Sequence, residues 1–223
     1  MRHIKPVERE RARIALAVNA DFLATWFEAV AWEIAERNVA LELIVDDQDH
    51  TLPLLARGDA IGCVSTSTHS PTGFVAEPIG AMEYECVASA EFAQTYFPRG
   101  LGLHSVLDAP AVLCNKKDAL HTRFLERLLD IKVSNYVAHF FPSPSALLSA
   151  IERGVGYGLV PSIQAHSRID SSGQLVRLAP DCSVTVDLYW HHWQTAPENA
   201  REINDLVVHH ARWMLIQRNG RYQ

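Results

Sequence analysis

Residues 13–65 decide the fold, because three short apolar runs alternate there with two segments of helical spacing. The helical segments are residues 22–37, which hold neither Gly nor Pro, and residues 51–57. The apolar runs are RIALAV at residues 13–18, VALELIV at residues 39–45 and AIGCVS at residues 60–65. The order strand, helix, strand, helix, strand predicts a parallel sheet with right-handed crossovers and helices on both faces.

The rest of the chain predicts a second unit of the same class. After a turn-rich stretch at residues 66–73, two strand-like segments follow each other without a helix, at residues 74–79 and 83–88. Further strands are expected at residues 111–114, 133–141, 157–161, 175–178 and 184–193, and helices at residues 90–96, 118–129, 143–153 and 197–217. The predicted fold class is therefore α/β, with two units.

The composition indicates a folded chain with no membrane-spanning segment. The 223 residues are 48% hydrophobic and 21% charged. The apolar runs are far shorter than the roughly 20 residues that cross a bilayer. No signal-peptide-like apolar stretch follows the basic N-terminus, so we expect a cytoplasmic location. The net charge is −6, and residues 1–13 carry five basic and two acidic side chains, which leaves −9 on the remainder. This sign disfavours direct binding to DNA.

The cysteines and histidines do not form a known catalytic or metal-binding motif. No CxxC, HxxxH, HExxH or GxSxG occurs, and no GxGxxG follows a strand. His191 and His192 would point to opposite faces of a strand, and His209 and His210 diverge by about 100° on a helix. We therefore expect no cofactor, no metal ligand and no catalytic residue, and we do not expect an enzyme.

Candidate ligand-binding residues follow the predicted strands, because open α/β sheets bind ligands at the carboxyl ends of their strands. In the first unit these residues are Asn19, Asp21 and Phe22 after the first strand, and Ser65 and Thr66 after the third. The acidic residues that follow the second strand, Asp46, Asp47 and Asp49, could collect a cation or form a turn with a helix N-cap, and the turn is favoured.

Ser143 is the candidate of the second unit, at the start of a helix whose free N–H groups suit a carboxylate. A simple N-cap role for Ser143 is an equally good interpretation, and the two roles are compatible.

Two motifs resemble the effector-binding region of LysR-type transcriptional regulators. LARGD at residues 55–59 resembles the family's turn from a helix into the third strand, and GVGYGLVP at residues 154–161 resembles its GxGxxxLP segment. The resemblance implies a fold like that of type II periplasmic binding proteins, with two Rossmann-like subdomains joined by two crossover strands. Subdomain I would comprise residues 14–85 and 185–218, and subdomain II residues 86–184.

Four shorter stretches resemble the arginine- and lysine-responsive branch of that family, the ArgP or LysG group, also called IciA for inhibitor of chromosome initiation. They are NADFLATW at residues 19–26, GCVS at 62–65, YFPRG at 96–100 and LYWH at 188–191. In this family a winged helix-turn-helix and a linker helix would precede residue 1. We therefore expect an isolated regulatory half that reaches promoter DNA only through that missing N-terminal domain, with residues 1–13 as the linker remnant.

The resemblance also implies a ligand, lysine or arginine, held between the subdomains. It adds Asp118 and Pro161 to the candidate site residues. A carboxylate, Asp21 or Asp118, would bind the cationic end of the amino acid, and hydroxyl or N–H groups at Ser143 and Ser65 its carboxylate. Phe22 departs from the branch, which usually has a small hydroxyl residue there, and this departure bears on ligand size and identity.

The helix expected at residues 22–37 predicts a dimer, and the family implies a tetramer for the full-length protein. The apolar surface of this helix is wider than one sheet covers, and Trp32 lies outside its main stripe. A second subunit could cover the remaining apolar surface, or loops of the same chain could cover it. Two other functions fit the fold. A solute-binding protein for amino-acid transport would require export, and an enzyme on this scaffold would require a nucleophile or a base pair that the sequence does not show.

Overall fold

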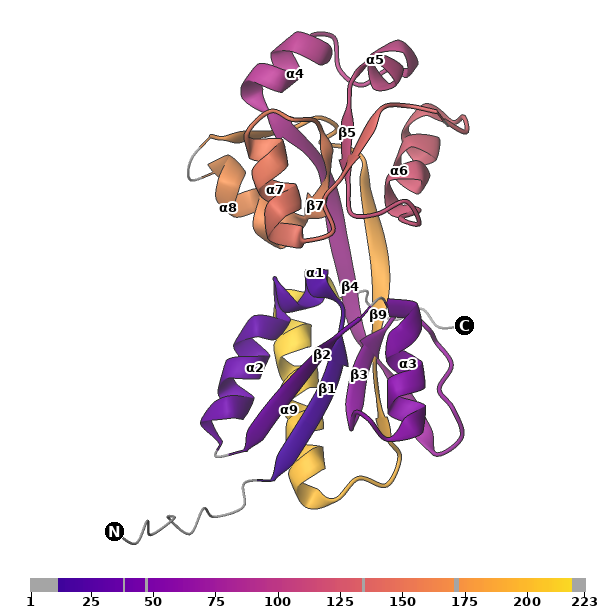
Figure 1. Cartoon of the computed structure of the whole chain (residues 1–223), viewed down its shortest axis with the longest axis vertical. Coiled ribbons are helices and arrows are strands. Elements are labelled where there is room, and N and C mark those ends of the chain that lie inside the picture. Colours follow the sequence, from indigo (N-terminus) through magenta and orange to yellow (C-terminus); the bar gives the residue numbers. More distant parts are fainter. Residues whose placement is uncertain (1–11, 38, 47, 134, 171–172, 218–223) are drawn as a thin grey trace, which may run out of the picture. The chain divides into compact units, whose positions relative to one another are not determined.

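The structure is a computed structural model that describes residues 12–37, 39–46, 48–133, 135–170 and 173–217, without the side chains of residues 48–50 (Figure 1). The chain divides into two compact units, unit 1 with residues 1–80 and 187–223 and unit 2 with residues 81–186. The strands β4 (Phe74–Ser89) and β9 (Ser183–Trp193) contribute to both units. Of the linker remnant expected at residues 1–13, only Ala12 and Arg13 are described, and Arg13 begins a strand.

Unit 1 contains the parallel arrangement that its sequence predicts. The strands β1 (Arg13–Val18), β2 (Ala40–Val45) and β3 (Gly62–Ser65) are neighbours in the order β2-β1-β3. The two crossovers lead in opposite directions along the sheet, so right-handed connections place their helices on opposite faces. Strand β9 continues the sheet as an antiparallel neighbour of β3.

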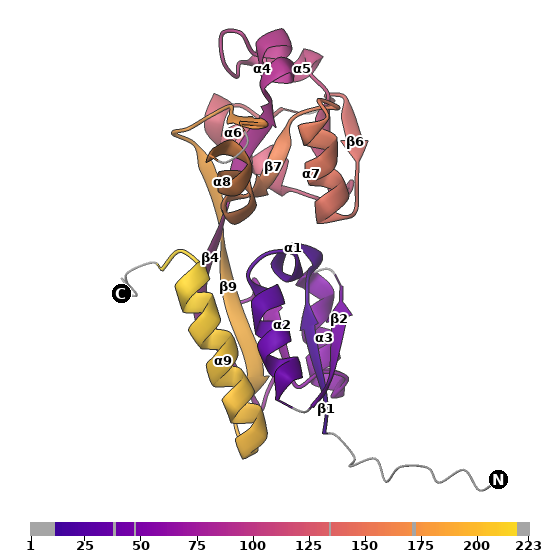
Figure 2. The same ribbon diagram turned by 90° about the vertical axis from the view of Figure 1, so that its left-hand side faces the viewer.

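Three helices cover the sheet of unit 1. The helix α2 (Phe27–Glu36) lies beside α9 (Glu198–Met214), as Figures 1 and 2 show, and α3 (Gln48–Arg57) packs on β1 and β3. The core beneath α3 contains the fully buried side chains of Ala17 and Cys63. Since each face of the sheet carries a helix, residues of both faces of β1 are buried, as the burial of Leu16, Ala17 and Val18 shows.

The single helix expected at residues 22–37 is wrong, because the structure has two helices there. The first is α1 (Ala20–Leu23), and α2 begins at Phe27. Between them the Thr25 hydroxyl donates hydrogen bonds to the carbonyl oxygens of Asp21 at 2.7 Å and Phe22 at 3.2 Å. Such side-chain bonds compete with the helical ladder and favour a break. The break lets the Trp26 ring pack edge-on against Phe27 inside the core.

Unit 2 combines a small parallel sheet with antiparallel strands. The strands β5 (Ala111–Leu113) and β6 (Ala138–Phe140) are parallel, and Ala111 also forms a parallel bridge to Tyr157, just before β7 (Gly158–Pro161). Both β7 and β8 (Leu175–Arg177) pair antiparallel with β4. The unit also contains α4 (Ala90–Tyr96), α5 (Leu103–Asp108), α6 (Leu120–Leu129), α7 (Pro144–Glu152) and α8 (Ser162–Asp170). The predicted α/β fold class is confirmed.

The glycines of the GVGYGLVP stretch allow β7 to lie close to β5. A Cβ atom at Gly156 would overlap the carbonyl oxygen of Pro110, and one at Gly158 would overlap that of Val112. The Pro110 carbonyl accepts a hydrogen bond from the Tyr157 N–H at 3.2 Å, and the Val112 N–H donates one to the Tyr157 carbonyl at 2.7 Å. These bonds hold the two backbones together, so neither can move aside at low cost. The spacing of the glycines is therefore a packing requirement of unit 2.

Three other details differ from the sequence-based expectation. The segments at residues 74–79 and 83–88 form one strand, β4, in which Gly80 has a φ of 125°. The helices α5 and α8 were not expected, because α5 is only six residues long and α8 is largely polar.

No helix among the described residues is long and apolar enough to cross a membrane.

Candidate functional site

The candidate residues of unit 1 lie at one edge of its sheet. Asn19, Asp21 and Phe22 follow β1, and Ser65 and Thr66 end or follow β3. Because β1 and β3 are parallel neighbours, with Ala17 opposite Cys63, their carboxyl ends meet. The structure thus brings these five residues to the edge where ligands of open α/β sheets bind.

Asn19 and Phe22 have structural tasks in the described geometry. The Asn19 side chain caps α1, where its Oδ1 accepts a hydrogen bond from the Phe22 N–H at 2.8 Å. The Phe22 side chain is only 1% exposed. Asp21 lies half-buried in the first turn of α1, where the helix dipole favours a carboxylate. Asp21 is therefore a candidate carboxylate at this edge, where Asp46, the exposed residue after β2, also lies.

The loop after β3 is ordered by hydroxyl groups. Ser65 is buried, and its Oγ accepts a hydrogen bond from the Ser67 N–H at 3.2 Å. The Ser67 hydroxyl donates to the carbonyl oxygen of His69 at 3.0 Å and accepts from its N–H at 3.2 Å. Thr66 lies half-buried between these residues. The position of Ser65 and Thr66 after a strand is visible in the sequence, whereas the hydrogen bonds that shape the loop are not.

The candidate residues of unit 2 follow three strands that run in the same direction. Asp118 comes after β5, Ser143 after β6, and Pro161 ends β7. Since β5 is parallel to β6 and forms a parallel bridge next to β7, these positions lie toward the same edge of the small sheet. Pro161 itself is buried, and α8 begins immediately after it.

Asp118 and Ser143 each lie at the start of a helix. One carboxylate oxygen of Asp118 accepts a hydrogen bond from the Leu120 N–H at 2.8 Å, which leaves acceptor capacity on a half-buried carboxylate. Ser143 is the N-cap residue of α7, and its exposed hydroxyl lies 3.0 Å from that of Ser145. The Ser143 carbonyl accepts the first helical bond, from Leu147 at 2.8 Å. The N–H groups of Ser145 and Ala146 precede that bond, and such groups suit an anion.

Sequence reasoning missed an aromatic and a cationic group at the same edge of unit 2. The Phe140 ring, at the end of β6, is 42% exposed, and the Lys116 ammonium lies 5.9 Å from its centroid. Asn115 accepts a hydrogen bond from the Lys117 N–H at 2.8 Å and so shapes the turn that leads to Asp118. In the sequence, the two adjacent lysines before Asp118 are the pattern that could have indicated a cationic group at this edge.

The first turns of α6 also hold a buried histidine. His121 is 1% exposed, its Nδ1 lies 2.9 Å from the Tyr136 hydroxyl, and burial lowers its pKa to about 4. Its ring contacts that of Tyr157, with centroids 5.2 Å apart. His121 is therefore neutral near pH 7 and belongs to the core of unit 2.

The described residues contain no group of three or more His, Cys, Asp or Glu side chains that could hold a metal ion. His191 and His192 take separate partners, since His191 bonds to Ser67 and Ser70 while His192 bonds to Asn204. Of the acidic residues after β2, Asp47 and the side chain of Asp49 lie outside the described part of the structure.

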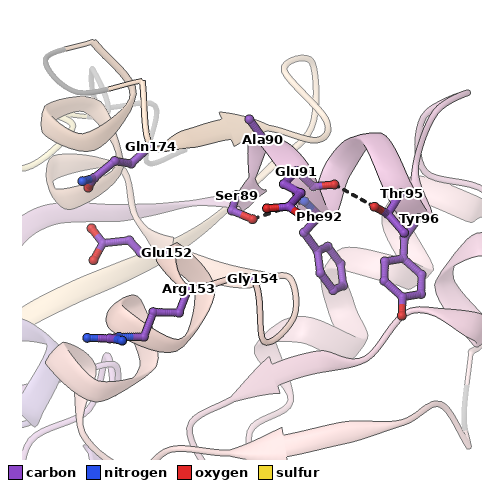
Figure 3. A pocket seen from close by; sticks show the side chains of 10 residues that line it. All are labelled: Ser89, Ala90, Glu91, Phe92, Thr95, Tyr96, Glu152, Arg153, Gly154 and Gln174. Atoms are coloured by element: carbon purple, nitrogen blue, oxygen red, sulfur yellow. Dashed lines mark hydrogen bonds between the residues drawn. The ribbon is translucent and has the colours of Figure 1, made fainter.

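A cavity of about 430 Å³ lies elsewhere in unit 2 (Figure 3). It is lined by polar groups from the start of α4, the end of α7 and Gln174, and none of the eight candidate residues lines it. Figure 3 shows that two of its hydroxyls serve α4 itself, because Ser89 accepts from the Phe92 N–H and Thr95 donates to the Glu91 carbonyl. Since Ser143 begins α7 and Glu152 ends it, this cavity and the candidate edge lie at opposite ends of that helix.

The fold and these strand-end positions are those of a ligand-sensing domain, and residues 8–212 match the LysR substrate binding domain. The chain belongs to this family. It is 35% identical over 216 residues to the HTH-type transcriptional regulator ArgP of Vibrio cholerae, an alignment that spans 96% of this chain and 70% of that protein.

Two solved structures carry the likeness into three dimensions. The crystal structure of ArgP from Mycobacterium tuberculosis superposes with a TM-score of 0.86 at 31% identity, over 96% of this chain and 72% of that one. Full-length LysG from Corynebacterium glutamicum with bound effector Arg superposes with a TM-score of 0.82 at 29% identity, over 92% of this chain and 70% of that one. The predicted resemblance to the ArgP and LysG branch is confirmed.

Proposed function

We propose that this chain is the effector-binding and dimerisation region of a LysR-type transcriptional regulator that senses a basic amino acid, arginine or lysine. The observation that carries the proposal is the likeness, over 92% of the chain, to a LysG structure that contains arginine as its effector. We further propose that the protein acts in the cytoplasm, has no enzymatic activity, and reaches promoter DNA through a separate DNA-binding domain. A transport function is not favoured, because the similar proteins are transcriptional regulators.

Each candidate edge offers groups that suit one end of a basic amino acid. Arginine and lysine carry a cationic side chain, for which Asp21 in unit 1 and Asp118 in unit 2 are the candidate carboxylates. Their α-carboxylate needs hydrogen-bond donors, which the start of α7 at Ser143 and the hydroxyls of Ser65 and Thr66 supply. Asn19, Phe22 and Pro161 would define the shape of the site.

The proposal is tested by calorimetric titration of arginine, lysine and norleucine, an uncharged analogue of lysine. A charge-assisted hydrogen bond contributes about 1.5 to 3 kcal/mol, so norleucine is expected to bind about tenfold to a hundredfold more weakly than lysine. Asp118→Asn, Asp21→Asn and Ser143→Ala are then titrated with the better ligand. At least one of the two aspartate variants is expected to bind that ligand about tenfold to a hundredfold more weakly than the wild type.

Matched controls separate a specific effect from a general change of charge. Asp205→Asn removes an exposed carboxylate of unit 1, on α9, and Asp108→Asn removes one of unit 2, at the end of α5. Both control variants are expected to bind like the wild type. Equal affinity for norleucine and lysine would contradict a basic amino acid as the effector. Unchanged binding of the better ligand in both Asp21→Asn and Asp118→Asn would contradict the assignment of these carboxylates to the site.

We also propose that the chain dimerises through the face of unit 1 that carries Trp32 and β2. Part of the apolar surface of α2, which was expected to pack on a second subunit, is covered by α9 of the same chain. Trp32 nevertheless remains 62% exposed, and Val45 on the edge strand β2 is 49% exposed. Apolar groups of this size on a surface helix and a neighbouring edge strand favour a protein interface.

A further inference from the structure

The loop at residues 66–73 joins β3 to β4 and begins with Thr66, a proposed effector contact. Its first turn is closed by Ser65 and Ser67, whose hydroxyls bond to backbone groups of the loop. Its far end is tied to unit 1 by the hydrogen bond from the Gln194 N–H to the Gly73 carbonyl, at 2.9 Å. The centre of the loop therefore needs a separate anchor if Thr66 is to keep one conformation.

His191 supplies this anchor from the neighbouring strand. It lies on β9 opposite Cys63 of β3, is fully buried, and belongs to unit 1 together with the whole loop. Its Nε2 lies 3.0 Å from the carbonyl oxygen of Ser67, and its Nδ1 lies 2.6 Å from the hydroxyl oxygen of Ser70. One imidazole ring thus bonds to two loop residues that are three positions apart.

The chemistry of the two partners fixes which ring nitrogen carries the proton. The Ser67 carbonyl can only accept, so Nε2–H is the donor to it. In the neutral ring Nδ1 is then unprotonated and accepts a hydrogen bond from the Ser70 hydroxyl. Burial lowers the pKa of His191, which favours this neutral form near pH 7. Both nitrogens of the ring are committed to the loop.

We propose that His191 is a positioning residue of the effector site: through Ser67 and Ser70 it holds residues 66–73 in the conformation that presents Thr66 to the ligand. The inference rests on the proposed function, because that function assigns Thr66 to the effector site. It predicts that the His191 bonds determine ligand affinity although His191 does not touch the ligand.

The test compares variants of the loop anchor with a matched variant of the same loop. Ser70→Ala removes the hydroxyl bonded to Nδ1 and leaves the buried ring in place. Thr68→Ala removes an exposed hydroxyl that bonds only to the neighbouring His69 ring. His191→Leu removes both anchors, and His191→Gln retains a neutral donor and an acceptor. Arginine and lysine affinity is measured by calorimetry, and backbone hydrogen exchange at Ser67 and His69 is measured in the ligand-free protein.

We expect Ser70→Ala to bind the better amino acid about threefold to tenfold more weakly and to exchange faster at Ser67 and His69, because it loses one hydrogen bond. Thr68→Ala should match the wild type in both measurements. His191→Gln should bind more tightly than His191→Leu. Adding Ser70→Ala to His191→Leu should have little further effect, since both changes remove the same contact.

The two measurements also distinguish failure of this inference from failure of the proposed function. Faster loop exchange in Ser70→Ala with wild-type amino-acid affinity would overturn the positioning role, as would wild-type exchange in that variant. If the wild type binds neither arginine nor lysine, the proposed function is wrong, and the exchange result alone then supports or overturns the anchoring of the loop by His191.

Discussion

Gly62 lies directly against the indole ring of Trp190, so that a Cβ atom at this position would overlap the six-membered ring. The two residues are on adjacent antiparallel strands, β3 and β9. Trp190 is fully buried and donates a hydrogen bond from its Nε1 to Asn204 Oδ1 at 3.0 Å, so the ring is fixed from α9 as well. Neither the backbone of β3 nor the indole has room to move.

Gly62→Ala is therefore expected to destabilise the protein by about 1 to 3 kcal/mol, as overpacking of a tight core does. Urea denaturation of Gly62→Ala, Trp190→Phe and the double variant measures the coupling. The smaller ring should relieve the clash, so Gly62→Ala should cost less in the Trp190→Phe protein. Strictly additive losses would show that the alanine methyl group does not meet the indole.

Asp118 is expected to separate helix capping from ligand binding. Its Oδ1 accepts a hydrogen bond from the N–H of Leu120, the first residue of α6, and asparagine can keep that bond whereas alanine cannot. Asp118→Ala should lower the free energy of unfolding by about 1 kcal/mol, while Asp118→Asn should leave it nearly unchanged. Both variants should lose basic amino-acid affinity if the carboxylate binds the cationic end. Normal affinity in both variants, with lower stability in Asp118→Ala only, would make Asp118 a helix cap and nothing more.

His121 is expected to make the stability of the protein depend on pH between about 6.5 and 4. Burial lowers its pKa from 6.5 to about 4, so the unfolded chain binds a proton in this range that the folded chain does not. The resulting stabilisation is complete above pH 6.5 and is lost as the pH falls toward 4. A shift of this size corresponds to about 3 kcal/mol.

Urea denaturation at pH 7, 6 and 5 measures this effect in the wild type and in His121→Gln. The variant should show a flatter dependence on pH, because it lacks the titrating group. His139→Gln, which removes an exposed histidine of the same unit, is the control and should follow the wild-type curve. A wild-type slope in His121→Gln would assign the acid sensitivity to other groups.

The sequence predicted those elements whose local pattern is regular. The strand at residues 13–18 was predicted with the bounds that the structure gives, and so was the helix at residues 90–96. The break between α1 and α2 was missed, since it depends on where the Thr25 hydroxyl donates its hydrogen bond. The helix α8 was missed because its sequence, SIQAHSRID, has little apolar periodicity.

The places of the candidate residues in the fold were predictable from the sequence, but their hydrogen bonds were not. The rule that ligands bind at strand ends selected Asp21 and Ser65, and both lie at the carboxyl ends of parallel strands in the structure. Ser143 was selected as the start of a helix, and it is the N-cap residue of α7. The bond between Ser70 and His191 joins residues 121 positions apart. It becomes visible only when β9 pairs with β3, and no local pattern of the sequence specifies that pairing.

Trp32 is expected to be a main contact of the proposed dimer. Its side chain is 62% exposed on α2, and transfer of a large aromatic surface from water into an interface is favourable. Sedimentation equilibrium at tens of micromolar should therefore show a species of twice the chain mass of 24.9 kDa for the wild type. Trp32→Ser should shift the equilibrium toward the monomer by a factor of about ten or more.

Trp213→Ser is the matched control, because Trp213 is 81% exposed on α9 of the same unit but lies on a different helix. It removes as much exposed aromatic surface, so a general effect of hydrophobicity would weaken the dimer in both variants. If only Trp32→Ser dissociates, the interface includes α2. A monomeric wild type would contradict the proposed dimer. A dimer lost only in Trp213→Ser would place the interface on α9 and not on α2.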